Sequence, residues 1–272
     1  GQQGYKMNTW KEAVTEYYKF SHMGKNDFTF RKFFDPFFEG MDLKDIKKEH
    51  IAMVRSKIKG KPGTVNRYLN YFRAILMYAY EELGWLDAKP VIKKVKEDSL
   101  RVKYFSLDDI KKLHNELPLH LQKPFIFSLL TGVRMSNCFN LKWVDIMENQ
   151  IAIDGSETKN GRSLCVPLNI KCRELLDSIE KVSPYVFTYA GRRITRASNT
   201  GWYTALKKAN LEGFRWHDIR HTWATHHVQN GTSLHTLQHL GGWSDFNIVN
   251  RYAHLSKDYL SDACEVSNSL IS

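Results

Sequence analysis

The chain has 272 residues, 42% of them hydrophobic and 25% charged, which is typical of a folded protein with one large domain or two ordinary ones. Its 40 Lys and Arg exceed its 29 Asp and Glu, and the net charge of +11 favours a polyanionic partner, most simply nucleic acid. There is no run of about 18 apolar residues and no signal-like start, so we expect neither a transmembrane helix nor a secretory signal.

Residues 1–88 are predicted to form a helical domain. Apolar residues at helical spacing predict its elements. They are a helix capped by Asn8 and running through Tyr17, a second near Thr29–Phe38, a third over Lys47–Lys59 and, after a turn at Pro62-Gly63, a long helix capped by Thr64 that ends near Gly84.

Residues 89–103 are predicted to be a linker, because they contain Pro90, a run of cations and little periodicity. Residues 104–272 mix helices with a few strands. The expected elements are a helix at Leu107–Glu116 with a Ser106/Asp109 capping box, a helix at Phe125–Leu130, another from near Ser136, a hairpin of Ile151–Ile153 and Ser163–Val166, a short strand at Tyr185–Thr188, and helices from Thr195 onward.

Cysteine usage indicates a reducing environment. The four cysteines lie in the second half of the chain, form no CxxC pair, and are predicted to be reduced thiols of a cytosolic protein: Cys138, Cys165, Cys172 and Cys264.

The strongest local basic signal lies in Ile51–Tyr80, which contains no acidic residue. Its six cations are candidate contacts to DNA phosphates: Arg55, Lys57, Lys59, Lys61, Arg67 and Arg73. Scattered Lys residues usually mark a solvated helix face, but the absence of acids favours DNA.

Three segments of the second part stand out together, in this order and spacing. They are Thr131-Gly132-Val133-Arg134 with Leu141–Ile146 after it, His217–Thr225, and Leu240–Ser244 followed by Arg251–Leu255. With a lysine on the hairpin between the first two, they resemble the tyrosine recombinase (phage integrase) family over about Lys103–Leu255. The helical first part is similar in size and pattern to the core-binding domain of that family. The resemblance implies a mainly α fold with a small antiparallel β-sheet, made of a helical core-binding domain and an α+β catalytic domain.

The resemblance also implies the site. Tyr252 matches the nucleophile that attacks a DNA phosphodiester, and Arg134 and Arg220 match the two arginines that clamp the phosphate. An arginine suits this task because its planar fork binds phosphate oxygens in pairs and keeps its charge. His217 lies three residues before Arg220, on the same helix face, and is predicted to exchange a proton with Tyr252.

Three further positions complete the expected site. Trp243 stands where many members carry a second histidine; an indole can donate a hydrogen bond but cannot transfer a proton. Lys159 matches the hairpin lysine that protonates the leaving 5′ oxygen, with Lys142 and Arg162 as nearby competitors. Asn137 departs from the family, which usually has an acid there, and offers a neutral acceptor instead.

A metal site is the alternative interpretation of the histidine-rich run His217, His221, His226 and His227. The first two are spaced i, i+4, as in helical zinc sites, but no glutamate follows His217 and no cysteine partner is evident. We therefore expect no metal and no cofactor.

The function implied is site-specific recombination through a 3′-phosphotyrosyl intermediate and a Holliday junction, without metal or ATP. It fits integration, excision, inversion and dimer resolution alike. The implied partners are duplex recombination sites, a homotetramer with exchange of the C-terminal tail (Ser256–Ser272) in trans or its packing in cis, and accessory DNA-bending proteins. The expected location is cytoplasmic, at the nucleoid. With almost nothing before Asn8, the chain is expected to be a form without an N-terminal arm-binding domain or a fragment from which it was cut.

Two other functions use the same features. A type IB topoisomerase would share the chemistry and relax supercoils without synapsis. A catalytically silent DNA-binding protein would keep the fold, although a binding module has no need of a nucleophile.

Overall fold

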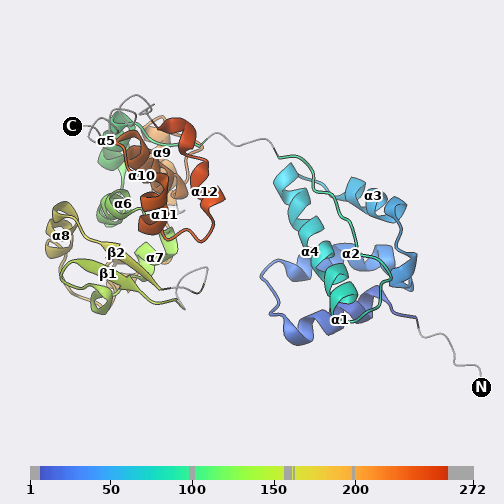
Figure 1. Cartoon of the computed structure of the whole chain (residues 1–272). Coiled ribbons are helices and arrows are strands. Elements are labelled where there is room, and N and C mark those ends of the chain that lie inside the picture. Colours follow the sequence, from blue (N-terminus) through green and yellow to red (C-terminus); the bar gives the residue numbers. More distant parts are fainter. Residues whose placement is uncertain (1–6, 98–101, 156–160, 162, 198–199, 257–272) are drawn as a thin grey trace, which may run out of the picture. The chain divides into compact units, whose positions relative to one another are not determined.

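The computed structural model describes residues 7–97, 102–155, 161, 163–197 and 200–256. They form two compact units, divided between residues 100 and 101 (Figure 1). The elements are mainly helices, with two small antiparallel sheets in the second unit, so the predicted fold class is confirmed. In the described residues, no helix is both long and apolar enough to cross a bilayer.

All named elements of the first unit are helices in its described residues, and Figure 1 shows the long helix α4 crossing α1 and α2. Its elements are α1 (Trp10–Phe20), α2 (Asp27–Phe38), the 3₁₀ turn η1 (Leu43–Asp45), α3 (Lys48–Lys57) and α4 (Pro62–Glu81). The core is largely aromatic: Trp10 packs on Phe34, Phe38 and Phe72, with ring centroids 5.2–6.0 Å apart.

Two predicted helix starts in this unit are wrong. Thr9, not Asn8, caps α1, because the Thr9 hydroxyl and the Glu12 carboxylate close a capping box. The α4 helix begins at Pro62 rather than after Thr64, so Pro62-Gly63 is the first turn of the helix. Proline is well tolerated there because its missing N–H would have had no partner inside the helix.

The segment predicted as a linker packs on the first unit near its start and on the second unit near its end. Ile92 is buried in the core of the first unit, and the Asn66 side chain bonds both the N–H and the C=O of Val95, at 2.8 and 2.9 Å. Val102 packs with Trp223 and Tyr252 in the second unit.

The second unit holds the remaining elements. They are α5 (Leu107–Glu116), α6 (Leu119–Thr131), α7 (Met135–Asn140), η2 (Trp143–Asp145), β1 (Gln150–Ile153), β2 (Leu164–Pro167), α8 (Ile170–Asp177), β3 (Thr188–Tyr189), β4 (Arg192–Arg193), α9 (Thr200–Lys208), α10 (His217–Gln229), α11 (Leu234–Gly241), α12 (Phe246–Asn250) and η4 (Ala253–Leu255). The capping box of Ser106 and Asp109 is present at α5, as predicted.

The predicted hairpin is present, with Ile151 opposite Val166 in β1 and β2. The predicted strand Tyr185–Thr188 is wrong in its position. The strand there is β3, which starts at Thr188 and pairs with β4, whereas Tyr185 makes an isolated bridge to Lys142. The Ala190-Gly191 turn, with both φ angles positive, closes this second hairpin.

Helix α6 starts six residues before the predicted Phe125 and runs through Pro124. A proline inside a helix costs one hydrogen bond of the helical ladder. Burial of Leu121, Phe125 and Phe127 in the main core outweighs that loss.

Gly132 ends α6 in the left-handed conformation, with φ of +63°, and packs against Trp223 of α10. A Cβ atom placed on Gly132 would lie 2.2 Å from the indole of Trp223. Glycine is therefore required both by the backbone conformation and by the close approach of α6 to α10.

We predict that Gly132→Ala lowers the free energy of unfolding by roughly 2–4 kcal/mol, because backbone strain adds to displacement of Trp223. Gly191→Ala is the matched control, since its φ is +74° but a Cβ there would have nothing within 4 Å. The control should cost about 1 kcal/mol. Urea unfolding of the two variants measures the difference, and equal losses would contradict the packing argument.

Candidate active site

Arg134 stands at the junction of α6 and α7. Thr131 bonds back to the Phe127 carbonyl at 2.7 Å, Gly132 turns the chain, and Arg134 is the N-cap residue of α7. The side chain is half-buried, and this burial lowers the pKa of its guanidinium. It therefore has a charge that is only partly solvated.

Arg220 is on α10 and is 3% exposed. Its two terminal nitrogens donate to the carbonyl of Gly132 at 2.6 Å and to the carbonyl of Gly241 at 2.5 Å. The guanidinium also lies 4.0 Å from the centre of the Trp243 ring. Burial and the Arg134 cation lower the pKa of Arg220 to about 9, so it stays charged at neutral pH.

Trp243 lies between Arg220 and Tyr252, with its ring centroid 6.2 Å from that of Tyr252. It follows the end of α11, where Gly242 adopts a φ of +62°. A Cβ on Gly241 would lie 2.0 Å from the Trp243 ring, so the two glycines let the indole fold back over the arginine.

Tyr252 follows α12, at the start of η4, and is 1% exposed. Its hydroxyl lies 2.5 Å from Nδ1 of His221. Burial raises the pKa of Tyr252 to about 12, although the cations Arg220 and Arg251 oppose this shift. In the free protein the phenol is therefore protonated at neutral pH.

His217 is the first residue of α10, and its ring meets that of His221 edge-on, with centroids 4.9 Å apart. Burial, followed by the Arg220 cation, lowers the pKa of His217. Burial and the neighbouring His217 lower the pKa of His221 to about 4, so His221 is neutral at physiological pH.

The structure thus brings Arg220, Trp243 and Tyr252 into contact. The His217 ring contacts His221, and His221 contacts the Tyr252 hydroxyl. The Tyr252 hydroxyl bonds His221, a residue to which the sequence analysis gave no part in the reaction. The i, i+4 spacing of the two histidines did place them on one face of α10. What sequence could not supply was the packing of η4 against that face.

Lys159 lies outside the described residues. Asn137 is buried on α7, and its Nδ2 has no hydrogen-bond partner among the residues that the structure describes. Across the same residues, no three His, Cys, Asp or Glu side chains gather as ligands for a metal ion.

The six cations predicted to contact DNA lie in the first unit, at the end of α3, in the following turn and along α4. All six are exposed, and none is paired with a carboxylate in the described part of the chain: Arg55, Lys57, Lys59, Lys61, Arg67 and Arg73. They are free to meet an anion.

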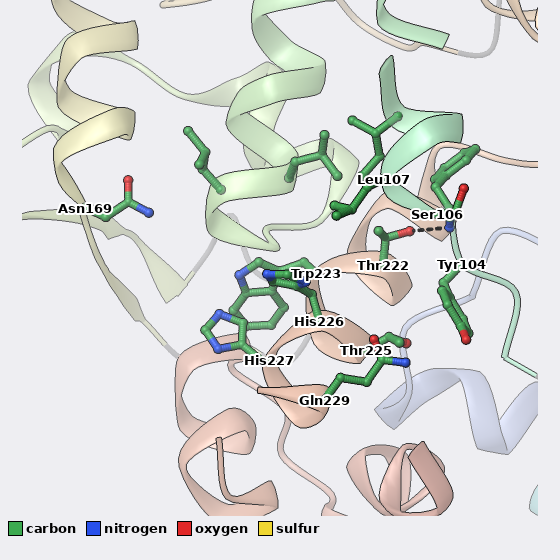
Figure 2. Close-up of a pocket in the computed structure, with 14 residues that line it drawn as sticks. Tyr104, Ser106, Leu107, Asn169, Thr222, Trp223, Thr225, His226, His227 and Gln229 are labelled. Carbon is green, nitrogen blue, oxygen red and sulfur yellow. Dashed lines mark hydrogen bonds between the residues drawn. The ribbon is translucent and has the colours of Figure 1, made fainter. Parts of the chain in front are cut away.

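Trp223 also lines a cavity of about 640 Å³ (Figure 2). Its lining is largely apolar and includes Leu107, Ile110 and Leu129, with His226 and His227 at one side. The Phe105 backbone N–H donates to Thr222 at 2.9 Å, which fixes the start of the unit to α10.

Known proteins resemble this chain in sequence and in fold. Residues 104–258 match the phage integrase family. The integrase of Salmonella phage P22 is 32% identical over 278 residues, covering 86% of this chain and 72% of that protein. The integrase of Escherichia phage 186 is 26% identical over 233 residues, covering 82% of this chain and 66% of that protein.

Among solved structures, the lambda integrase tetramer bound to a Holliday junction has the same fold. The TM-score is 0.71 at 18% identity, over 93% of this chain and 78% of that one. The chain belongs to the phage integrase family of tyrosine recombinases.

We predict that Arg220→Lys lowers the free energy of unfolding by about 2 kcal/mol more than Arg134→Lys does. A lysine keeps the charge but cannot bond both the Gly132 and Gly241 carbonyls in the geometry of the guanidinium. Urea unfolding at neutral pH measures both variants. Equal losses would mean that the two carbonyl bonds contribute nothing to stability.

We also predict a pH dependence of stability. The pKa of His221 is lowered in the folded state, to about 4, so its contribution is complete above the unfolded value of about 6.5 and is lost as pH falls toward 4. Wild type should therefore lose stability relative to His221→Asn between pH 7 and pH 4. A constant difference in unfolding free energy across this range would contradict the assignment of a buried neutral imidazole.

Proposed function

We propose that this chain is a site-specific DNA recombinase in which Tyr252 attacks the scissile phosphate and forms a 3′-phosphotyrosyl bond. The observation that carries the proposal is the cluster of Tyr252, Trp243 and Arg220, a buried nucleophile beside a fixed cation. A partner duplex supplies the 5′ hydroxyl that attacks this bond, and a second round resolves the Holliday junction.

The arginines bind the non-bridging oxygens of the phosphate, where negative charge develops in the transition state. Arg220 has five N–H groups, of which bonds to the Gly132 and Gly241 carbonyls occupy two. The others, together with the half-buried Arg134, are free to bind the phosphate. Neutralisation by fixed guanidinium groups is why the proposed reaction needs no metal.

Other roles divide between proton transfer and hydrogen bonding. Lys159 protonates the leaving 5′ oxygen, and the histidines at the start of α10 are the candidates for proton exchange with Tyr252. Trp243 donates its N–H and packs beside the nucleophile, since an indole cannot carry a proton between groups. The energy of the broken phosphodiester is kept in the phosphotyrosyl bond, so the reaction needs no ATP.

Binding to the duplex uses the exposed cations of the first unit. These six residues contact phosphates and fix position rather than sequence. Related proteins act as assemblies: the lambda integrase structures hold a dimer on a core site and a tetramer on a Holliday junction. We assign this chain the same kind of assembly, working on cellular DNA in the cytoplasm at the nucleoid, with DNA-bending proteins as accessories.

Tail exchange would link the protomers of such an assembly. Residues 257–272 lie outside the described part of the chain, but their sequence has apolar positions at helical spacing: Tyr259, Leu260, Ala263 and Val266.

The test uses candidate site DNA nicked near the cleavage point, incubated with the protein in EDTA. We expect a covalent complex on a denaturing gel for wild type and none for Tyr252→Phe, which lacks the nucleophilic oxygen but should still bind DNA. Tight DNA binding with no complex at any site would favour a silent binding protein. Relaxation of supercoils without a recombinant product would favour a topoisomerase.

A further inference from the structure

The nucleophile of this family must lose a proton when it attacks, and the structure identifies a group positioned to receive it. We propose that His221 is the general base that takes the proton of the Tyr252 hydroxyl during cleavage. The observation is the distance of 2.5 Å between Nδ1 of His221 and the hydroxyl oxygen. This inference rests on the proposed recombinase function and adds a catalytic residue to it.

The protonation state of His221 fits this role. The Tyr252 phenol is protonated, so it donates and Nδ1 accepts, which requires the proton of the neutral imidazole to be on Nε2. A neutral imidazole is also the form that can accept a second proton. His221 lies one helical turn after His217, and His221 is half-buried whereas His217 is exposed.

The surroundings of His221 keep it neutral in the free protein. On its own helix it meets His217 and Arg220, Arg215 lies just before the helix, and Arg251 and Tyr252 face it from the segment after α12. Burial and these cations all disfavour an imidazolium. Tyr252 is held protonated by its burial, so proton transfer does not run to completion before DNA binds.

The scissile phosphate changes this balance. It brings negative charge against the same cations, and the attacking phenol acquires positive character as its bond to phosphorus forms. In the step, the bond from Tyr252 Oη to phosphorus forms and the bond from phosphorus to O5′ breaks. The Oη proton moves to His221, and Lys159 supplies a proton to O5′. In rejoining, the imidazolium returns its proton to the departing tyrosine.

The geometry also separates the two histidines. The His217 ring meets the edge of His221 at an interplanar angle of 89°, one ring further from the nucleophile. His221, which contacts the hydroxyl directly, therefore takes the nucleophile's proton in place of His217. The sequence motif alone assigns this proton transfer to His217.

The experiment compares His221→Asn with His217→Asn in single-turnover cleavage of the nicked DNA. Asparagine keeps an acceptor near Nδ1 but cannot take a proton. We expect His221→Asn to cleave about 100-fold more slowly or worse, the usual loss when a general base is removed. Its rate should rise steadily with pH, because hydroxide replaces the base, whereas the wild-type rate is flat above the pKa of His221. A merely structural defect would leave the shape of the pH profile unchanged.

A substrate with sulfur in place of the leaving 5′ oxygen distinguishes loss of the base for Tyr252 from loss of the acid for the leaving group. A thiolate leaves without being protonated, so this substrate bypasses only the acid. It should restore cleavage by Lys159→Ala but not by His221→Asn. Restoration of His221→Asn, or cleavage within about 3-fold of wild type on ordinary DNA, would overturn the proposal.

Two controls keep the outcomes distinct. Urea unfolding and DNA binding establish that each variant is folded, and His221→Gln replaces the asparagine variant if that one is not. Failure of wild type to form any covalent complex would instead refute the recombinase function, and with it the role of His221. An active wild type with an unaffected His221→Asn refutes the role of His221 alone.

Discussion

The second unit depends on the burial of one positive charge, the guanidinium of Arg220. A cation removed from water is costly unless polar groups of the protein replace the lost hydration. Here the replacements are carbonyls at two helix ends, Gly132 after α6 and Gly241 at the end of α11. Both helix ends carry carbonyls without a partner inside the helix and the negative pole of the helix dipole. They therefore stabilise the buried guanidinium by hydrogen bonds and by charge.

The glycines at these ends follow from the same requirement. For the carbonyls to reach Arg220, α6 must end against Trp223 and α11 must turn back so that Trp243 covers the guanidinium. A side chain at Gly132 or Gly241 would overlap an indole. The two tryptophans in turn pack with Val249 and Tyr252, so the cation, the aromatic cluster and the nucleophile form one packing unit.

Much of this could be predicted from sequence, because the motifs are short and local. The resemblance to tyrosine recombinases implied Arg134, Arg220, Trp243 and Tyr252, and the hairpin and most helices follow from periodicity and capping. The misses involve competition between local signals and tertiary packing. The helix predicted over Phe125–Leu130 starts six residues earlier because core burial outweighs the cost of Pro124, and Tyr185 is β-prone but bridges Lys142 rather than joining β3. His221 was missed because its contact with Tyr252 joins segments 31 residues apart.

The electrostatics of the free site explain why a neutral base suits this reaction. Two effects act on Tyr252: burial raises its pKa, and the nearby cations lower it, with burial the stronger. The phenol is therefore unreactive until a phosphate enters. The same burial and cations act on His221 in one direction only, because both disfavour its charged form. DNA binding thus relieves the penalty on an imidazolium while it brings the phosphate to the phenol, which couples activation of the nucleophile to arrival of its substrate.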